Sequence, residues 1–437
     1  MIKFKCNLVL HFFYSTEEIM GKNVLLAQSG GPTAVINSSI VGAFEAAKRS
    51  GKVDRIYSAV GGILGVINEE LIDLTAIPTE KIQALRFTPS SGLFSCRHVL
   101  PEDMNDEEYK RIFEVFEAYD IGYFFYNGGN DSMDTAYKLD KYAKMHGIDV
   151  KVNGIPKTID NDLFGTDHCP GFGSAAKYIN VTLQECAHDT FSYPNSKTVI
   201  IMETMGRNAG WLAASSCLAQ YNGNQVADLI YLPETTFDLD SFLGDISDKL
   251  SKQTMVFAVV SEGVRGADGK PYFSSSKNTQ DKFGHQQLGG LAAVLADEVK
   301  KNIIKRVKTV NPDISQRCAS HVMSLTDYEE SYLAGAASFE FAANGISGVM
   351  SAFERLSDDP YKIDIKPLTL DKCANAEKMI PRDWINENGN NVNEKFKAYA
   401  LPLIQGEVAI RYKNGLPDYF VLDKNNIEKK VLKDFIK

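Results

Sequence analysis

The sequence predicts an α/β fold in which mainly parallel sheets are covered by helices on both faces. Short, continuous apolar runs alternate along the chain with segments of helical period, a pattern typical of βα units. The apolar runs end in glycine or polar residues, as strands do where they carry ligand sites. The chain has 437 residues and 44% hydrophobic content, which is enough for two or three lobes with their own cores.

The first βα unit lies near the amino terminus. Residues 24–27 form an apolar strand pattern, a Gly-Gly-Pro turn follows, and Val35, Ile36, Ile40 and Phe44 recur at helical spacing. Similar apolar runs that end in polar or glycine residues occur within residues 121–147, 150–162, 197–219 and 255–264. Residues 265–284 are expected to form a long exposed loop, and the regular alternation is lost after Asp358.

The composition indicates which kinds of partner and which cellular location to expect for this protein. Lys plus Arg total 47 against 56 Asp plus Glu, so the net charge of -9 attracts neither nucleic acid nor an anionic membrane. The seven cysteines are scattered and form no C-x-x-C pair, which fits a reducing cytoplasm better than disulfides or a zinc site. Residues 1–20 make a poor secretion signal, because their interrupted apolar run is far below the ~20 residues of a membrane span.

Glycine and polar residues gather where the strands are expected to end. The turn at Gly30 and Gly31 is either only a tight turn or a set of free backbone N–H groups that bind an anion. In GGNDS, residues 128–132, glycines let a ligand approach the backbone, while Asn130 and Asp131 either cap the next helix or serve that ligand. Each motif alone leaves both interpretations open.

Two further stretches carry charged groups. In PKTIDND, residues 156–162, Asp160 and Asp162 form either a side-chain-stabilised turn or a general base and a metal ligand beside Lys157. Arg207, in MGRNAG, is either a surface ion-pair partner or a planar group for binding phosphate.

Taken in order, SGGPTAVIN, GGNDS, PKTIDND, METMGR, SEGV and SQR resemble the motif series of the phosphofructokinase family. The resemblance covers roughly residues 22–350, and the combination of TIDND with MGR is highly specific. It implies two similar three-layer α/β lobes with mainly parallel sheets and an active site in the cleft between them. It also implies phosphoryl transfer to the 1-hydroxyl of fructose 6-phosphate by a cytoplasmic homodimer or homotetramer.

The resemblance divides the chain into four parts. Residues 1–20 are expected to be an N-terminal extension, residues 21–172 the phosphoryl-donor lobe and residues 173–317 the sugar-phosphate lobe. Residues 318–437 are expected to return to the first lobe and to end in a tail that marks a subgroup of the family.

The resemblance also implies roles for particular residues. Asp160 matches the general base, while Gly31 and Arg97 match positions that touch the phosphoryl donor. Asn130 replaces an aspartate that ligates magnesium in many relatives, so Asp162 becomes the better ligand for the expected Mg²⁺. The positions expected to hold the sugar phosphate are Thr158, Met205, Gly206, Arg207, Glu262, Arg317 and, as a retained charge near a subunit boundary, Lys308.

Lys157 and Asp131 together indicate the phosphoryl donor. In family members that use ATP both positions are glycine. Here the aspartate side chain occupies the region where the α-phosphate and ribose of a nucleotide would lie, and its charge repels that phosphate. The lysine can pair with pyrophosphate and stabilise the leaving phosphate. By resemblance to the family, the pair therefore implies pyrophosphate as the donor. Because pyrophosphate and the sugar 1-phosphate have similar transfer potentials, the resemblance also implies a readily reversible reaction.

Three alternatives to this function remain. One is an ATP-dependent phosphofructokinase. Another is a noncatalytic regulatory subunit, which is disfavoured because Asp160 and Arg207 are both present. The third is a dinucleotide-dependent oxidoreductase, which is disfavoured by the absence of a G-x-G-x-x-G turn after the first strand.

Overall fold

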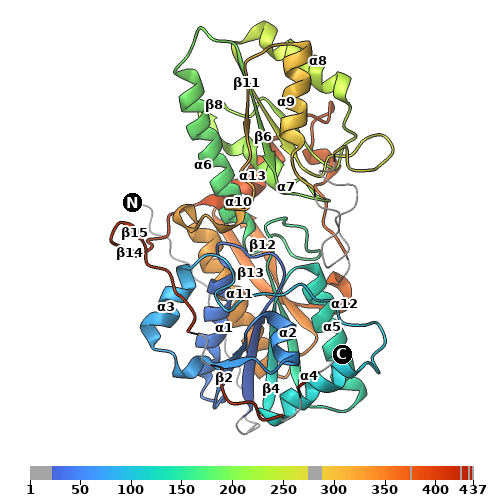
Figure 1. The fold of residues 1–437 in the computed structure, drawn as a ribbon, viewed down its shortest axis with the longest axis vertical. Coiled ribbons are helices and arrows are strands. Elements are labelled where there is room, and N and C mark those ends of the chain that lie inside the picture. Colours follow the sequence, from blue (N-terminus) through green and yellow to red (C-terminus); the bar gives the residue numbers. More distant parts are fainter. Residues whose placement is uncertain (1–21, 274–287, 375, 424–425, 432–433, 436–437) are drawn as a thin grey trace.

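The computed structural model describes residues 22–273, 288–374, 376–423, 426–431 and 434–435. These residues form two α/β lobes, one above the other in Figure 1, and each lobe is built around its own sheet. Most strand pairs are parallel and helices cover both sheets, which confirms the predicted fold class. The expected extension at residues 1–20 and residues 274–284 of the expected loop lie outside the described residues.

The larger sheet has seven strands in the order β13-β12-β5-β4-β1-β2-β3. Its inner strand pairs are parallel, whereas β3 and β13 pair antiparallel at the two edges. The strands are β1 (Asn23–Gln28), β2 (Ile56–Ala59), β3 (Leu71–Asp73), β4 (Ile121–Gly128), β5 (Lys151–Pro156), β12 (Val349–Asp358) and β13 (Tyr361–Thr369). Every residue of β1 is buried, as expected for a parallel strand with helices on both sides.

Helices pack on both faces of this sheet. One face is covered by α1 (Ile36–Ser50), α3 (Thr79–Phe87) and α11 (Leu325–Ala343), and the other by α2 (Gly62–Ile67), α4 (Glu107–Ala118), α5 (Asn130–Met145) and α12 (Leu370–Cys373). Successive residues of β1 enter different cores, with Leu26 on the first face and Leu25 on the second. Gly42 and Gly335 let α1 and α11 pack closely, because a side chain at either would strike the backbone of the other helix.

The smaller sheet is entirely parallel and has the order β11-β6-β10-β9. Its strands are β6 (Thr198–Thr204), β9 (Leu229–Tyr231), β10 (Met255–Ser261) and β11 (Val307–Val310). One face packs on α6 (Phe172–Phe191) and α7 (Trp211–Ser215), and the other on α8 (Leu239–Lys252) and α9 (Leu291–Asn302). The short elements α10 (Ser315–Cys318) and η3 (Ser320–Val322) lead back to α11.

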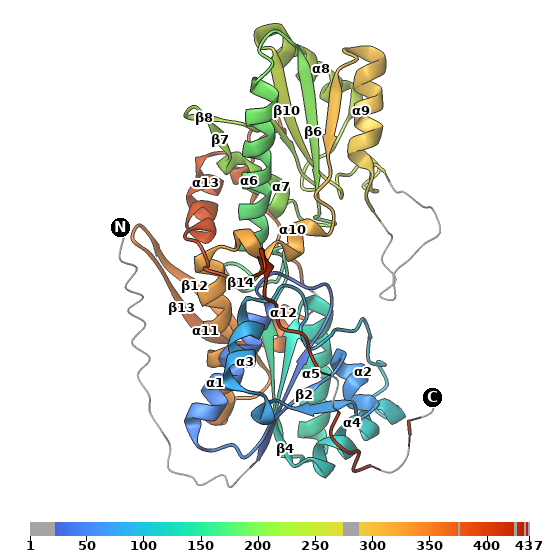
Figure 2. The same cartoon turned by 60° about the vertical axis from the view of Figure 1, so that its left-hand side comes forward.

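The C-terminal segment contacts both lobes. β12 and β13 form a hairpin that extends beside α11 in Figure 2 and joins the larger sheet. The chain then leaves the regular alternation, as predicted for the residues after Asp358. The short helices α13 (Glu394–Ala400) and η5 (Leu401–Ile404) pack into the core of the smaller-sheet lobe beside α6. The tail therefore links the two lobes.

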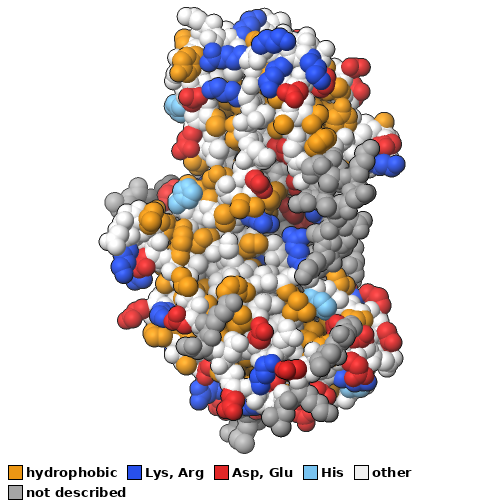
Figure 3. Space-filling view, viewed as in Figure 1, with side chains coloured by type: hydrophobic (Ala, Val, Ile, Leu, Met, Phe, Trp, Pro, Cys, Tyr) orange, Lys and Arg blue, Asp and Glu red, His pale blue; other side chains and the backbone are white. Residues whose placement is uncertain are grey.

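The surface carries both signs of charge. Basic and acidic side chains occur on each lobe in the face shown in Figure 3, in keeping with the modest net charge of -9. No helix in the described part of the chain combines the length and apolarity that a membrane span requires.

Candidate active site

A cavity of about 1080 Å³ lies between the lobes. Its walls come from residues that follow β1, β4 and β5 in the larger sheet and β6, β10 and β11 in the smaller one. Ligands of parallel sheets gather at these carboxyl ends of the strands. All but two of the predicted site residues line the cavity: Gly31, Arg97, Asn130, Asp131, Lys157, Thr158, Asp160, Asp162, Met205, Arg207, Glu262 and Arg317.

Gly206 and Lys308 are the two exceptions. Gly206 lies in the turn between two lining residues, with a φ of 141°, and a Cβ there would come within 2.7 Å of the Ala209 carbonyl oxygen. Glycine is therefore required by the turn itself. Lys308 lies on β11, where its Nζ pairs with Asp189 Oδ2 at 3.0 Å. Its side chain is 47% exposed and does not line the cavity of this chain.

Three cationic side chains surround the turn after β1. Lys157 Nζ donates a hydrogen bond to the Gly31 carbonyl oxygen at 2.6 Å. A Cβ on Gly31 would lie 3.2 Å from Arg317 Nη1 and 4.0 Å from Arg97 Nη2. Arg317, which was predicted to hold the sugar phosphate, thus lies beside the turn predicted to bind the donor. The glycine leaves room for an anion at the most basic point of the cavity.

Asn37, which sequence reasoning missed, supports this turn from behind. Its Nδ2 donates to the carbonyl oxygens of Thr88 and Ser90 at 2.8 and 2.7 Å. Its Oδ1 accepts from Gln28 Nε2 at 2.8 Å and from the Gly92 N–H at 3.0 Å. These bonds fasten the segment that leads to Arg97 against β1. The sequence did contain a signal for Asn37, because it is a polar residue on the apolar face of a predicted helix.

Lys157 is buried although it carries a charge. It follows Pro156, the last residue of β5, and is 3% exposed. Burial lowers the pKa of its ammonium to about 8, and the nearby Arg317 and Arg97 add to this effect, while Asp160 opposes it. An anion bound in the cavity would raise this pKa again, since it would favour the charged form.

The TIDND loop places two carboxylates in the cavity. Thr158 Oγ1 accepts a hydrogen bond from the Asp160 N–H at 3.1 Å, which fixes the start of the turn. Burial raises the pKa of the Asp160 carboxyl, against the opposing charges of Arg207 and Lys157. Burial also raises the pKa of Asp162 to about 7, and the charge of Asp160 contributes to this shift. Burial in the loop therefore raises the pKa of both carboxyls above the ordinary value of an aspartate.

Asn130 and Asp162 form an oxygen-rich corner of the cavity. Asn130 begins α5, and its Nδ2 donates to Asp162 Oδ2 at 3.2 Å. Asn130 Oδ1 is buried and has no hydrogen-bond partner among the described residues. Those residues contain no cluster of three or more His, Cys, Asp and Glu that could enclose a metal. The corner offers one carboxylate and one amide oxygen, which suits a divalent metal that completes its shell with water and phosphate oxygens.

Arg207 and Glu262 lie on the opposite lobe. The turn that carries Arg207 is fixed by Gln316, whose Oε1 accepts from the Met205 N–H at 3.0 Å. Arg207 Nε is buried and has no hydrogen-bond partner in the described part of the chain, as expected of a group that awaits an anion. Burial, together with the charge of Asp160, raises the pKa of Glu262 to about 7.

Three acidic residues of the cavity wall were not predicted, namely Glu203, Asp313 and Glu377. Glu203 caps α9, because its carboxylate accepts from the N–H groups of Gly290 and Ala292 at 2.9 and 2.8 Å. Its position within the apolar run of β6 was a usable signal. Glu377 comes from the C-terminal tail and accepts from Asn208 Nδ2 at 2.6 Å, and no motif indicated it.

Comparisons with known proteins find a matching family model and similar full-length chains. A family model described as Phosphofructokinase matches residues 23–324. A pyrophosphate–fructose 6-phosphate 1-phosphotransferase of Methylococcus capsulatus is 42% identical over 95% of this chain and 99% of its own. Its counterpart in Xanthomonas campestris is 42% identical over 94% and 98%. The crystal structure of a pyrophosphate-dependent phosphofructokinase from Nitrosospira multiformis, 42% identical, covers 95% of this chain and 100% of that one with a TM-score of 0.86.

Proposed function

Since this chain belongs to the phosphofructokinase family, we propose that it transfers a phosphoryl group from pyrophosphate to fructose 6-phosphate. The products are fructose 1,6-bisphosphate and phosphate, and the reaction runs in both directions. The names of the relatives support these two substrates. The observation that carries the choice of donor is the buried Lys157 ammonium, bonded to the Gly31 carbonyl oxygen in a cavity that Asp131 also lines.

We assign one substrate to each lobe. Residues 21–172 would form the pyrophosphate lobe and residues 173–317 the sugar-phosphate lobe, while residues 318–437 return to the first lobe. Support comes from Lys157 and Arg97, which lie at the turn after β1, and from Arg207, which lies after β6. The assembly would be a cytoplasmic homodimer or homotetramer, with Lys308 serving a sugar-phosphate site at the subunit boundary.

The donor site would select pyrophosphate over a nucleotide through the charge and the size of its side chains. Asp131 lies in the first turn of α5, where a helix N-terminus would otherwise attract a nucleotide phosphate. Its carboxylate cancels this attraction and fills the space. Lys157, Arg97 and Gly31 would bind pyrophosphate, and Lys157 would stabilise the charge that grows on the leaving phosphate.

Asp160 would act as the general base. Its raised pKa suits a carboxylate that takes a proton from the 1-hydroxyl of the sugar in the forward reaction and returns it in the reverse one. Thr158, Met205, Gly206, Arg207, Glu262 and Arg317 would hold the sugar phosphate so that this hydroxyl faces the transferred phosphorus.

A divalent metal, which we take to be Mg²⁺, would be held by Asp162 and the orphaned Asn130 amide oxygen. When bound, it would neutralise charge on the phosphate oxygens of the donor. Asn130 contributes no charge of its own, so the substrate phosphates would supply much of the attraction.

A coupled assay that compares donors tests this function. Pyrophosphate is expected to support rapid formation of fructose 1,6-bisphosphate, and ATP is expected to support little or none. Efficient use of ATP would favour the ATP-dependent alternative, and inactivity with both donors would favour a regulatory subunit. Sedoheptulose 7-phosphate as the acceptor tests the width of the sugar site.

Removing Arg207 should weaken the sugar site selectively. Arg207→Ala is expected to weaken fructose 6-phosphate binding by about 1.5–3 kcal/mol, because a hydrogen-bonded charge pair is lost. Steady-state kinetics should show a higher KM for fructose 6-phosphate and an unchanged KM for pyrophosphate, which serves as the internal control. A change confined to the KM for pyrophosphate would mean that Arg207 serves the donor half of the cavity, and its assignment to the sugar phosphate would be wrong.

The pH dependence of kcat/KM for pyrophosphate should report the Lys157 ammonium. The pKa of about 8 means that the free enzyme loses this charge as the pH rises past that value, so kcat/KM is expected to fall there. The Lys157→Met variant should show a lower kcat/KM without this alkaline limb. An identical limb in the variant would assign the titration to another group or to pyrophosphate itself.

A further inference from the structure

Asn161 lies between the two cavity carboxylates of the TIDND loop but points in the opposite direction. It is 0% exposed and has a φ of 56°, in the left-handed region that asparagine adopts more readily than most residues. Its Nδ2 donates to the Tyr399 hydroxyl oxygen at 2.8 Å, and its Oδ1 accepts from the Cys169 N–H at 2.9 Å. The side chain thus ties the turn between Asp160 and Asp162 to two other segments.

Tyr399 is a rigid partner for this asparagine. It belongs to α13 in the C-terminal tail, and its ring packs against Trp211, Trp384 and Phe396. Its hydroxyl donates to the Asp167 carbonyl oxygen at 2.7 Å while it accepts from Asn161. One hydroxyl group therefore joins Asn161 and Asp167, which lie at separate points of the loop that begins after β5.

A second tail residue, Lys378, holds the same loop. Its N–H donates to the Asp162 carbonyl oxygen at 2.7 Å, and its Nζ donates to the carbonyl oxygens of Thr166 and Asp167 at 3.2 and 2.7 Å. Its own carbonyl oxygen accepts from Trp211 Nε1 at 2.9 Å, which connects it to the other lobe. Tail residues thus contact the backbone of the loop on both sides of its centre.

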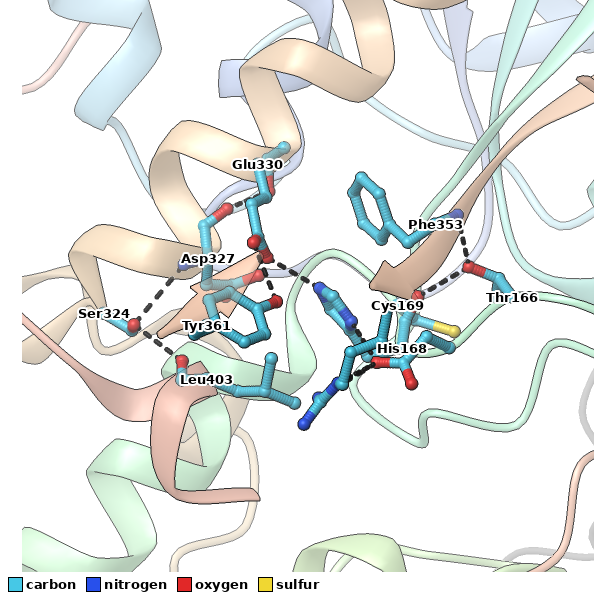
Figure 4. A network of polar contacts seen from close by, with 12 residues as sticks. Thr166, His168, Cys169, Ser324, Asp327, Glu330, Phe353, Tyr361 and Leu403 are labelled. Atoms are coloured by element: carbon cyan, nitrogen blue, oxygen red, sulfur yellow. Dashed lines mark hydrogen bonds and ion pairs between the residues drawn. The ribbon is translucent and has the colours of Figure 1, made fainter. Parts of the chain in front are cut away.

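The far end of the loop is anchored by a buried ionic network, shown in Figure 4. His168 lies with Nε2 2.7 Å from Glu330 Oε2 and with Nδ1 2.8 Å from Asp167 Oδ2. Burial alone would lower the pKa of His168, but these two carboxylates outweigh it and raise the pKa to about 9. Arg355 adds a second contact to Asp167 at 3.0 Å. The residue that accepts the Tyr399 hydrogen bond is therefore itself fixed.

We propose that Asn161 and Tyr399 are positioning residues through which the C-terminal tail holds Asp160 and Asp162 in their reacting geometry. The inference rests on the proposed function, because it concerns the residues assigned there as base and metal ligand. The two carboxylates occupy a loop. Asp162 Oδ2 accepts from Asn130 Nδ2 at 3.2 Å on the cavity side, and Asn161 ties the turn between the carboxylates to Tyr399 and Cys169. A displacement of about 1 Å in such a group costs up to about 100-fold in rate.

Tyr399→Phe tests this directly, with Tyr109→Phe as its matched control. Tyr109 is 0% exposed, against 6% for Tyr399, and likewise donates its hydroxyl to a backbone carbonyl, that of Pro101 at 2.6 Å, but it lies on α4 away from the cavity. Both variants should lose similar stability in thermal unfolding. Tyr399→Phe is expected to lower kcat by about 10- to 100-fold with little change in the KM for fructose 6-phosphate. Equal kcat values for the two variants would overturn the proposal.

Asn161→Gly separates the side-chain bonds from the backbone conformation, since glycine adopts the left-handed φ without strain. It should lower kcat at least as much as Tyr399→Phe. The double variant should be only slightly slower than Asn161→Gly alone, because the bond between the two side chains is already lost and only the bond from Tyr399 to the Asp167 carbonyl oxygen is removed in addition. Independent, multiplying losses would contradict a shared hydrogen bond, as would full activity in Asn161→Gly.

Amide hydrogen exchange of residues 158–166 gives a readout that does not depend on activity. Exchange should be faster in Tyr399→Phe than in Tyr109→Phe and wild type, and equal rates would overturn the positioning role. The wild-type assay with pyrophosphate and fructose 6-phosphate is done first. Its failure would contradict the proposed function, while the exchange experiment would still decide whether the tail holds the loop.

Discussion

Asp160→Asn is expected to lower kcat by about 10²–10⁴-fold, the usual loss when a general base is removed. The substitution preserves the size of the side chain, which matters in a buried loop, but asparagine cannot accept the proton of the sugar hydroxyl. The KM for fructose 6-phosphate should change little, because the cationic and backbone groups of the sugar site remain. Steady-state rates in both directions should fall together, since one carboxyl serves both.

Asp162→Asn provides a matched control for this prediction. It removes the same charge two positions away, from a residue assigned to the metal rather than to the sugar hydroxyl. The Mg²⁺ concentration needed for half-maximal rate should rise in Asp162→Asn and stay near the wild-type value in Asp160→Asn. Turnover of Asp160→Asn within tenfold of wild type would reject its assignment as the base.

Lys157 and Asp131 are expected to control the choice of donor in different ways. Lys157→Gly should lower kcat with pyrophosphate by about 10²-fold, because a charge that stabilises the leaving phosphate is lost. Asp131→Gly should admit ATP, because it removes an obstruction and a repulsive charge. The double variant should use ATP better than either single variant. Rates with each donor, measured at saturating fructose 6-phosphate, decide between these outcomes.

Lys157→Met refines this test by keeping the bulk of the side chain without its charge. If Lys157 acts through charge, this variant should lose pyrophosphate turnover as Lys157→Gly does and should gain no ATP activity. The donor-selection argument would be wrong if Asp131→Gly remained inactive with ATP while Lys157→Gly kept full pyrophosphate turnover.

The site residues that could be predicted are those that lie close together in short sequence motifs. Lys157, Thr158, Asp160 and Asp162 line the cavity as predicted, because a strand, a proline and two closely spaced aspartates define their geometry within a few positions. Likewise β1 and β4 end at one edge of the larger sheet, and β6 and β10 end at one edge of the smaller sheet, since parallel strands present their carboxyl ends together. Both edges border the cavity. The roles assigned to these residues remain predictions.

The unpredicted part depends on contacts between distant segments. Tyr399 meets Asn161 across 238 positions, and nothing in the local sequence of α13 distinguishes that tyrosine from one that merely packs. Glu377 enters the cavity from a tail without regular alternation. Arg317 belongs to a recognised motif, yet its proximity to Gly31 follows from how the lobes face each other, which a single motif cannot specify.

The parallel pairing of β12 with β5 has a consequence for how the chain folds. The Val349 N–H donates to Asn153 Oδ1 across 196 positions, and all strands of the smaller sheet are synthesised between them. During translation the earlier strands can assemble, but β5 remains an uncovered sheet edge until residues 349–358 leave the ribosome. Such an edge is prone to pair with another chain. Nascent chains stalled before β12 should therefore aggregate or recruit chaperones more readily than those stalled after β13.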